Sequence, residues 1–100
     1  MMPTLEETKR ELQIFWNMTK EDEEKLDGQM KDAESILIQK HREQPIDFDK
    51  DRSARRLFFD LLKYIRSEAE AAFYSDYSQQ LNELYLRAPA LKGGEAVEKR

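Results

Sequence analysis

The sequence contains no cysteine, little glycine and proline, and no long apolar run. Without cysteine, the chain can form neither a disulfide nor a thiolate metal site. Three glycines and three prolines in 100 residues supply too few turns for an all-β fold. No apolar stretch approaches the roughly 20 residues that cross a bilayer, and the first residues lack the apolar core of a signal peptide. We therefore expect a soluble protein with no membrane partner.

Charged residues are abundant, and their net sign limits the classes of partner. They make up 38% of the chain against 39% hydrophobic residues, and the formal net charge is −4. A chain of this length suits a single domain with a modest core. Because binding to nucleic acid requires Lys and Arg to neutralise phosphates, the whole-chain charge gives no general attraction to DNA. Contact with DNA would need a local cationic patch.

The N-terminal residues carry the start signal of a short helix. Thr4 and Glu7 have the spacing of a capping box, which predicts a helix over residues 4–12. A helix this short is marginal alone and must dock on the rest of the domain. Residues 13–18 then form a connector, in which we expect Trp16 to act as an anchor in the core or at its rim.

A second helix is predicted from Thr19 to about residue 41. Thr19 is a favoured N-cap, and the four acids that follow Lys20 suit the positive end of a helix dipole. Its apolar residues recur at helical spacing: Leu26, Met30, Ala33 and Leu37. Gly28 lies inside this helix, where it indicates either a close approach by a neighbouring helix or a tolerated defect.

The third predicted helix is long and amphipathic. Residues 46–48 alternate apolar, polar and apolar, which predicts a short extended segment before it. Asp49, Asp51 or Ser53 can cap this helix, which is expected to start between Asp49 and Asp51 and to end near Tyr74 or Ser75. One face carries its apolar residues, namely Ala54, Leu57, Phe58, Leu61, Ile65, Ala69 and Ala72.

A fourth helix is predicted from Asp76 or Ser78 to the residue before Pro89, because proline ends the pattern. Residues 89–100 are expected to be a disordered, flexible tail. The sequence thus predicts an all-α fold in which residues 1–88 form a small bundle of about four helices around the long third one.

Catalytic and cofactor signals are absent from the sequence. His41 is the single histidine, and no second His or Cys accompanies it as a metal ligand. A Ser/His/Asp triad would have to use this histidine, and nothing marks a nucleophile. We therefore predict that the protein is not an enzyme and binds no cofactor or metal.

The face of the third helix opposite its apolar stripe is cationic and includes one aromatic ring. It carries Arg52, Arg56, Phe59, Lys63 and Arg66. Such a charged face is most often simply solvated. An exposed phenyl ring among the cations would favour a contact surface instead, so this hypothesis requires Phe59 to be exposed and the arginines to be free of pairs within the chain.

An acidic segment offers a complementary surface. Residues 20–34 hold seven acids and three bases. The candidate partners of the cationic face in a second copy are Glu21, Glu23, Glu24 and Asp27. If the two surfaces lie on different sides of the subunit, the contact between copies is head-to-tail, and repeated rotation can close a ring.

Several segments also resemble a known family. They are LEETKRELQI, EDEEKLDGQMKDAESIL and IDFDKDRSARRLFFDLLKYIRSEAEAAFYSDYSQQLNEL, which together span about residues 5–87. In order and spacing they resemble the small head–tail connector proteins, or adaptors, of long-tailed bacteriophages, some of which are labelled DNA-packaging proteins. The matching residues are ordinary helical ones and contain no catalytic motif.

This resemblance implies a structural role without turnover. Such proteins are small helical domains that form a ring beneath the portal protein after the genome is packaged. The ring extends the DNA channel without recognising DNA sequence, and it docks the next neck or tail completion protein. The resemblance places the protein in the neck of the virion, and in the host cytoplasm before assembly. The tail, through Leu91, Lys92 and Val97, would contact the portal or neck.

Two other classes of function compete with this reading. The first is a small DNA-binding or packaging accessory protein that uses the cationic face over residues 52–66. The second is a generic helical interaction module, such as a regulator or an antitoxin-like partner.

Overall fold

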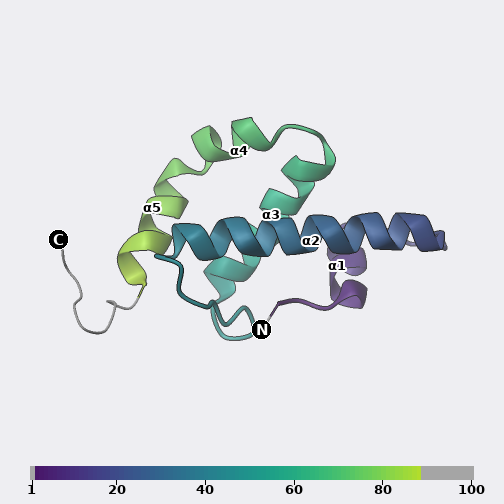
Figure 1. Ribbon diagram of the computed structural model, residues 1–100, viewed down its shortest axis with the longest axis horizontal. Helices are drawn as coiled ribbons and strands as arrows, with labels where there is room; N and C mark the ends of the chain where they lie inside the picture. The colour runs from purple at the N-terminus through teal and green to yellow at the C-terminus, as the bar shows by residue number, and fades with distance from the viewer. Residues whose placement is uncertain (1, 89–100) are drawn as a thin grey trace.

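The computed structural model describes residues 2–88, and these form five helices and no strand (Figure 1). The helices are α1 (Leu5–Glu11), α2 (Lys20–Lys40), α3 (Arg52–Arg66), α4 (Glu70–Asp76) and α5 (Ser78–Arg87). The predicted all-α class is confirmed. No described helix is both long enough and apolar enough to cross a membrane. The predictions for residues 89–100, including those for Leu91, Lys92 and Val97, lie outside the described residues.

The starts of the first three helices follow the predicted caps. The Thr4 hydroxyl accepts from the Glu7 amide at 3.1 Å, and the Glu7 carboxylate accepts from the Thr4 amide at 3.0 Å. The Thr19 hydroxyl accepts from the amide of Asp22 at 3.1 Å and so caps α2. At α3, the Asp51 carboxylate accepts from the third amide of the helix at 3.0 Å. Each bond satisfies an amide that has no partner within its own helix.

The core lies where α2 and α3 cross. α2 runs along the long axis of the molecule (Figure 1). The predicted apolar stripe of α2 is buried in full. On α3 the stripe is buried from Ala54 to Leu61, and Ile65 is half-buried. Ile46 and Phe48 are also buried while Asp47 between them is exposed, as the alternating pattern predicts.

α3 is shorter than predicted, because it ends at Arg66 instead of continuing to residue 74 or 75. Glu68 adopts a left-handed conformation with φ of 57°. The amide of Ala69 then donates to the carbonyl of Tyr64 at 2.8 Å, and the amide of Glu68 donates to the carbonyl of Ile65 at 3.0 Å. This pair of bonds is a Schellman motif, in which glycine normally takes the left-handed position. The sequence gives no glycine there, so propensity alone predicts a continuous helix.

The break at Glu68 folds the chain into an elbow that closes an aromatic cluster. α4 turns back so that Phe73, which is fully buried, stacks on Tyr77 with ring centroids 4.6 Å apart. Tyr64 meets the edge of Phe73 at 5.5 Å. The Tyr64 hydroxyl donates to Asp76 at 2.8 Å, and the Tyr77 hydroxyl donates to Asp60 at 3.1 Å. Burial of these rings is favourable enough to explain why the chain accepts a strained residue at the elbow.

Gly28 on α2 is exposed, and a methyl group added to it would meet no atom within 4 Å. Of the two readings of this glycine, a close approach by a neighbouring helix is therefore wrong. Gly28 is a defect that the helix tolerates.

Candidate interaction surfaces

The cations predicted to face outward on α3 are all exposed. Arg52, Arg56 and Lys63 form no ion pair with any side chain of residues 2–88. We call these three residues the cationic surface. Arg66 differs from them, because its guanidinium donates to the side chain of Gln29 at 3.1 Å and lines a hollow beside Trp16. Among the described residues, the cations of the predicted stripe therefore form no ion pair, but Arg66 already has a hydrogen-bond partner.

The prediction that Phe59 is exposed within this stripe is wrong. Its exposed fraction is 5%, and its ring meets Phe58 edge-on at 5.4 Å. The guanidinium of Arg55 also lies over this ring, 5.4 Å from its centroid. Phe59 is a core residue, and it cannot supply an apolar anchor for a contact with another copy.

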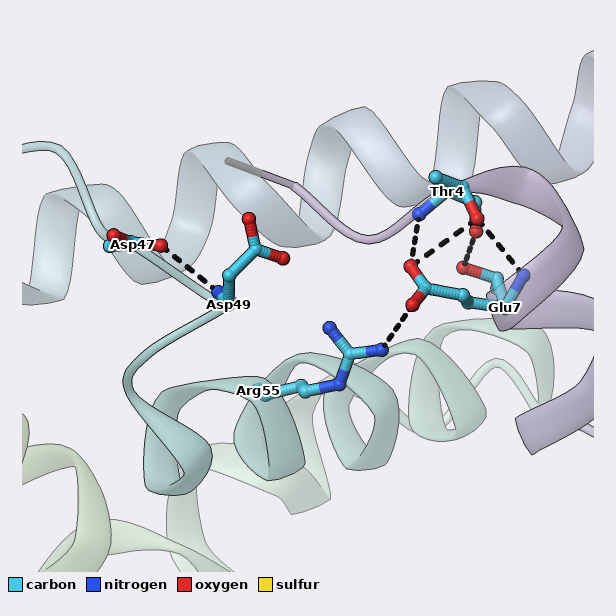
Figure 2. Close-up of polar contacts among 6 residues, drawn as sticks. Thr4, Glu7, Asp47, Asp49 and Arg55 are labelled. Atoms are coloured by element: carbon cyan, nitrogen blue, oxygen red, sulfur yellow. Dashed lines mark hydrogen bonds and ion pairs between the residues drawn. The ribbon is translucent and has the colours of Figure 1, made fainter.

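The Arg55 side chain that lies over the Phe59 ring is bound to α1. Figure 2 shows Arg55 extending from α3 to Glu7, whose carboxylate accepts from the guanidinium at 3.0 Å while it closes the capping box with Thr4. The Thr4 amide and the Arg55 guanidinium hold the pKa of Glu7 below its usual value. A helical wheel of α3 contains no information about α1, so periodicity alone could not place Phe59.

Two of the four candidate acids are already paired within the chain. Glu23 binds Lys9 of α1, and Asp27 binds Lys31 one turn along α2 at 3.1 Å. Glu21 and Glu24 are exposed, and neither forms an ion pair with a described side chain. We call Glu21, Asp22 and Glu24, all exposed at the start of α2, the acidic surface.

The connector between α1 and α2 exposes two aromatic rings. Phe15 has an exposed fraction of 81% and Trp16 of 63%, although Ile14 beside them is buried. The prediction that Trp16 anchors the core or its rim is therefore wrong. Gln13, with φ of 60°, ends α1 in a Schellman motif that turns the chain and directs Ile14 into the core. The sequence signal for exposure was the presence of four large apolar residues within positions 14–18, too many for one connector to bury.

A groove lies between α3 and α5, next to the cationic surface. It is lined by Arg56, Leu57, Asp60, Tyr77, Gln80 and Arg87, among others. The groove has no signal in the sequence, because its two walls are far apart in the chain.

One end of this groove is fixed by a salt bridge. Arg87 of α5 donates to the Asp51 carboxylate at 2.8 Å, and Asp51 also caps α3. Partial burial alone would raise the pKa of Asp51, but the Ala54 amide and the Arg87 guanidinium outweigh it and hold this pKa below its usual value. The carboxylate therefore stays ionised, and α5 stays attached to the start of α3.

His41 is a buried residue at the C-terminal end of α2. Its Nδ1 lies 3.1 Å from the carbonyl oxygen of Gln44, which fits an Nδ1–H donor. Within residues 2–88, no three or more His, Asp and Glu side chains gather as a group that could hold a metal ion.

Comparisons of the chain with protein-family models, with curated proteins and with solved structures find no match.

Proposed function

We propose that this chain is a structural subunit that assembles with copies of itself, and that the assembly is a head–tail connector ring beneath a phage portal. The ring would extend the DNA channel and dock the next neck or tail component, in the virion neck. The proposal is supported by the resemblance of residues 5–87 to the connector proteins. The observation that carries it is the presence of two exposed, oppositely charged surfaces on one small domain.

The positions of these surfaces favour a head-to-tail contact. The start of α2, with the acidic surface, lies at one end of the long axis, and α5 lies toward the other end (Figure 1). The salt bridge between Arg87 and Asp51 places the start of α3, with Arg52 and Arg56, beside α5. Two different patches that bind each other between copies generate a ring when the rotation closes.

The charges would set the register of this contact more than its strength. An exposed ion pair contributes only about 0–1 kcal/mol, and salt screens it. A net charge of −4 also suits a channel through which DNA must slide, because attraction to phosphates would retain it.

The test is to incubate the purified chain with the portal protein of the same virus and to image the product by electron microscopy. We expect a ring of this chain beneath the portal. The variant R56E/K63E reverses two exposed charges, so it should fold normally and fail to form the ring. Portal particles without added density, or rings that form equally well with the reversed charges, would contradict the proposal.

Arg52, Arg56 and Lys63 form no ion pair with residues 2–88, which also favours a second candidate, a DNA-binding packaging accessory. A gel-shift experiment with duplex DNA at low and moderate salt separates the two candidates. Binding that weakens steeply with salt and is lost in R56E/K63E would favour the accessory protein.

A further inference from the structure

We propose that Phe15 and Trp16 of one copy insert into the groove between α3 and α5 of a second copy, and that these two rings are the apolar anchor of the contact between subunits. This inference rests on the self-assembly proposed above. It supplies the apolar anchor that Phe59, as a buried residue, cannot provide. The surface is the α3–α5 groove of one copy, and its occupant is the connector of the next copy.

The two rings have the exposure that an anchor requires. Most of the surface of Phe15 and Trp16 is open to water, whereas the neighbouring Ile14 is buried and Met18 is half-buried. The connector is therefore held to the domain on both sides of the rings, which lowers the entropy cost of placing them in a partner. Adjacent exposed aromatics on a small soluble domain mark a contact surface.

The groove has the chemistry that receives aromatic rings. Its lining includes the side chains of Leu57 and Tyr77, which can contact a ring, and two guanidinium groups, those of Arg56 and Arg87. The other lining residues are polar or acidic: Ser53, Asp60, Gln80 and Glu83. A guanidinium binds carboxylate through its edge and an aromatic ring through its face, so Arg87 can keep its bond to Asp51 while a ring stacks on it. Arg–aromatic stacking is favoured where the ring also shields the groove from water.

Charge complementarity selects a second copy as the occupant. The acidic surface begins at Glu21, five residues after Trp16, and the cationic surface continues from Arg56 along α3. Five residues of extended chain span at most about 18 Å, and a helix is about 10–12 Å across. Rings seated in the groove would therefore leave Glu21 and Glu24 within reach of Arg52, Arg56 and Lys63 of the same neighbour.

The contact is tested by photo-crosslinking in the full-length chain. Benzoylphenylalanine replaces Phe15, the protein is irradiated at high concentration with and without the portal, and the covalent dimer is mapped by mass spectrometry. We expect crosslinks to residues 53–60 and 77–87 of the other copy. The control carries the same probe at Ser35, an exposed position of α2 outside both surfaces, and should give no crosslink to the groove.

A set of variants measures the strength of the contact. F15A/W16A should weaken self-association by at least about thirtyfold, as expected for two central aromatic residues, and should leave the melting temperature unchanged because both rings are exposed. R52E/R56E and E21R/E24R should each weaken it, and a chain carrying all four substitutions should regain association. Failure of the combined chain to recover would overturn the pairing of these surfaces.

The outcomes separate this inference from the proposed function. Rings on the portal in which position 15 crosslinks to other segments would overturn the anchor and leave the connector role intact. Crosslinks to the groove without any ring on the portal would support the anchor and contradict the connector role. Absence of a covalent dimer under both conditions would overturn the anchor.

Discussion

The aromatic residues of this protein fall into two groups with opposite surroundings. At the elbow between α3 and α4, Tyr64, Phe73 and Tyr77 pack ring on ring, and the tyrosine hydroxyls reach carboxylates. In the connector before α2, Phe15 and Trp16 are exposed. The chain can bury aromatic rings where it turns back on itself, so the exposure of the second group is a property of that site, and the contact proposed above would use it.

The two groups should differ most in how much the free energy of unfolding falls when one ring is replaced by alanine. Phe73→Ala removes a fully buried ring from the cluster and should reduce the free energy of unfolding by about 3–5 kcal/mol. Phe15→Ala removes an exposed ring and should change it by less than about 0.5 kcal/mol. Urea denaturation followed by circular dichroism measures both values. Equal losses in the two variants would show that the connector ring is buried in solution.

The elbow should also respond to alkaline pH, whereas the connector has no tyrosine. Burial and the Glu70 carboxylate, which accepts from the Tyr74 hydroxyl at 2.8 Å, raise the pKa of Tyr74 to about 12. The unfolded chain releases this proton near pH 10, so the stabilisation is complete below that pH and is lost as pH rises from about 10 to 12.

Allowing for solvent screening, we expect this loss to amount to about 1 kcal/mol. Urea titrations between pH 9 and 12 measure it, and tyrosinate absorbance reports the ionisation itself. Tyr74→Phe keeps the ring and removes the ionising group, so its stability should fall less over the same interval. An identical pH profile in the variant would contradict the assignment.

The exposed face of α2 at Gly28 should tolerate an added methyl group, in contrast to the packed elbow between α3 and α4. Gly28→Ala adds a methyl group in open space and removes the backbone freedom that glycine has in the unfolded chain. The free energy of unfolding should rise by about 0.5–1 kcal/mol, measured by thermal denaturation. A matched Ala33→Gly change, at a buried position of the same helix, should instead destabilise the protein.

The smallest expected effect concerns the left-handed residue that ends a helix next to each of the two aromatic groups. Gln13 and Glu68 end α1 and α3 in the left-handed conformation, which costs a residue with a side chain about 1–2 kcal/mol. Gln13→Gly and Glu68→Gly should relieve this cost, and the greater freedom of glycine when unfolded should reduce the net gain to about 0.5 kcal/mol. Urea midpoints measure it. A loss of stability in either variant would mean that the original side chain makes a stabilising contact.

The sequence was sufficient wherever structure depends on neighbours within one or two turns. Thr4, Thr19 and Asp51 cap their helices as predicted, and the stripe from Leu26 to Leu37 is buried. Each of these depends on a hydrogen bond over three residues or on the 3.6-residue period, both of which can be read along the chain.

The sequence was insufficient wherever a segment distant in the chain determines the surroundings of a residue. Phe59 is covered by Arg55, which Glu7 of α1 holds, and the chain turns back after α3 where Phe73 packs against Tyr64 and Tyr77. The α3–α5 groove has the same origin, since its walls meet only after the elbow has formed. Local propensity predicts none of these features, because each depends on tertiary contacts.

The hydrogen bonds at the elbow have a consequence for the number of subunits in the ring proposed above. Tyr64 with Asp76 and Tyr77 with Asp60 tie the end of α4 to α3 just before α5 begins. They therefore bear on the angle at which α5, one wall of the groove, meets α3. In a cyclic assembly the number of copies is a full turn divided by the rotation from one subunit to the next. A few degrees of change at these tyrosines would therefore alter the number of subunits, so loosening them should yield a mixture of ring sizes.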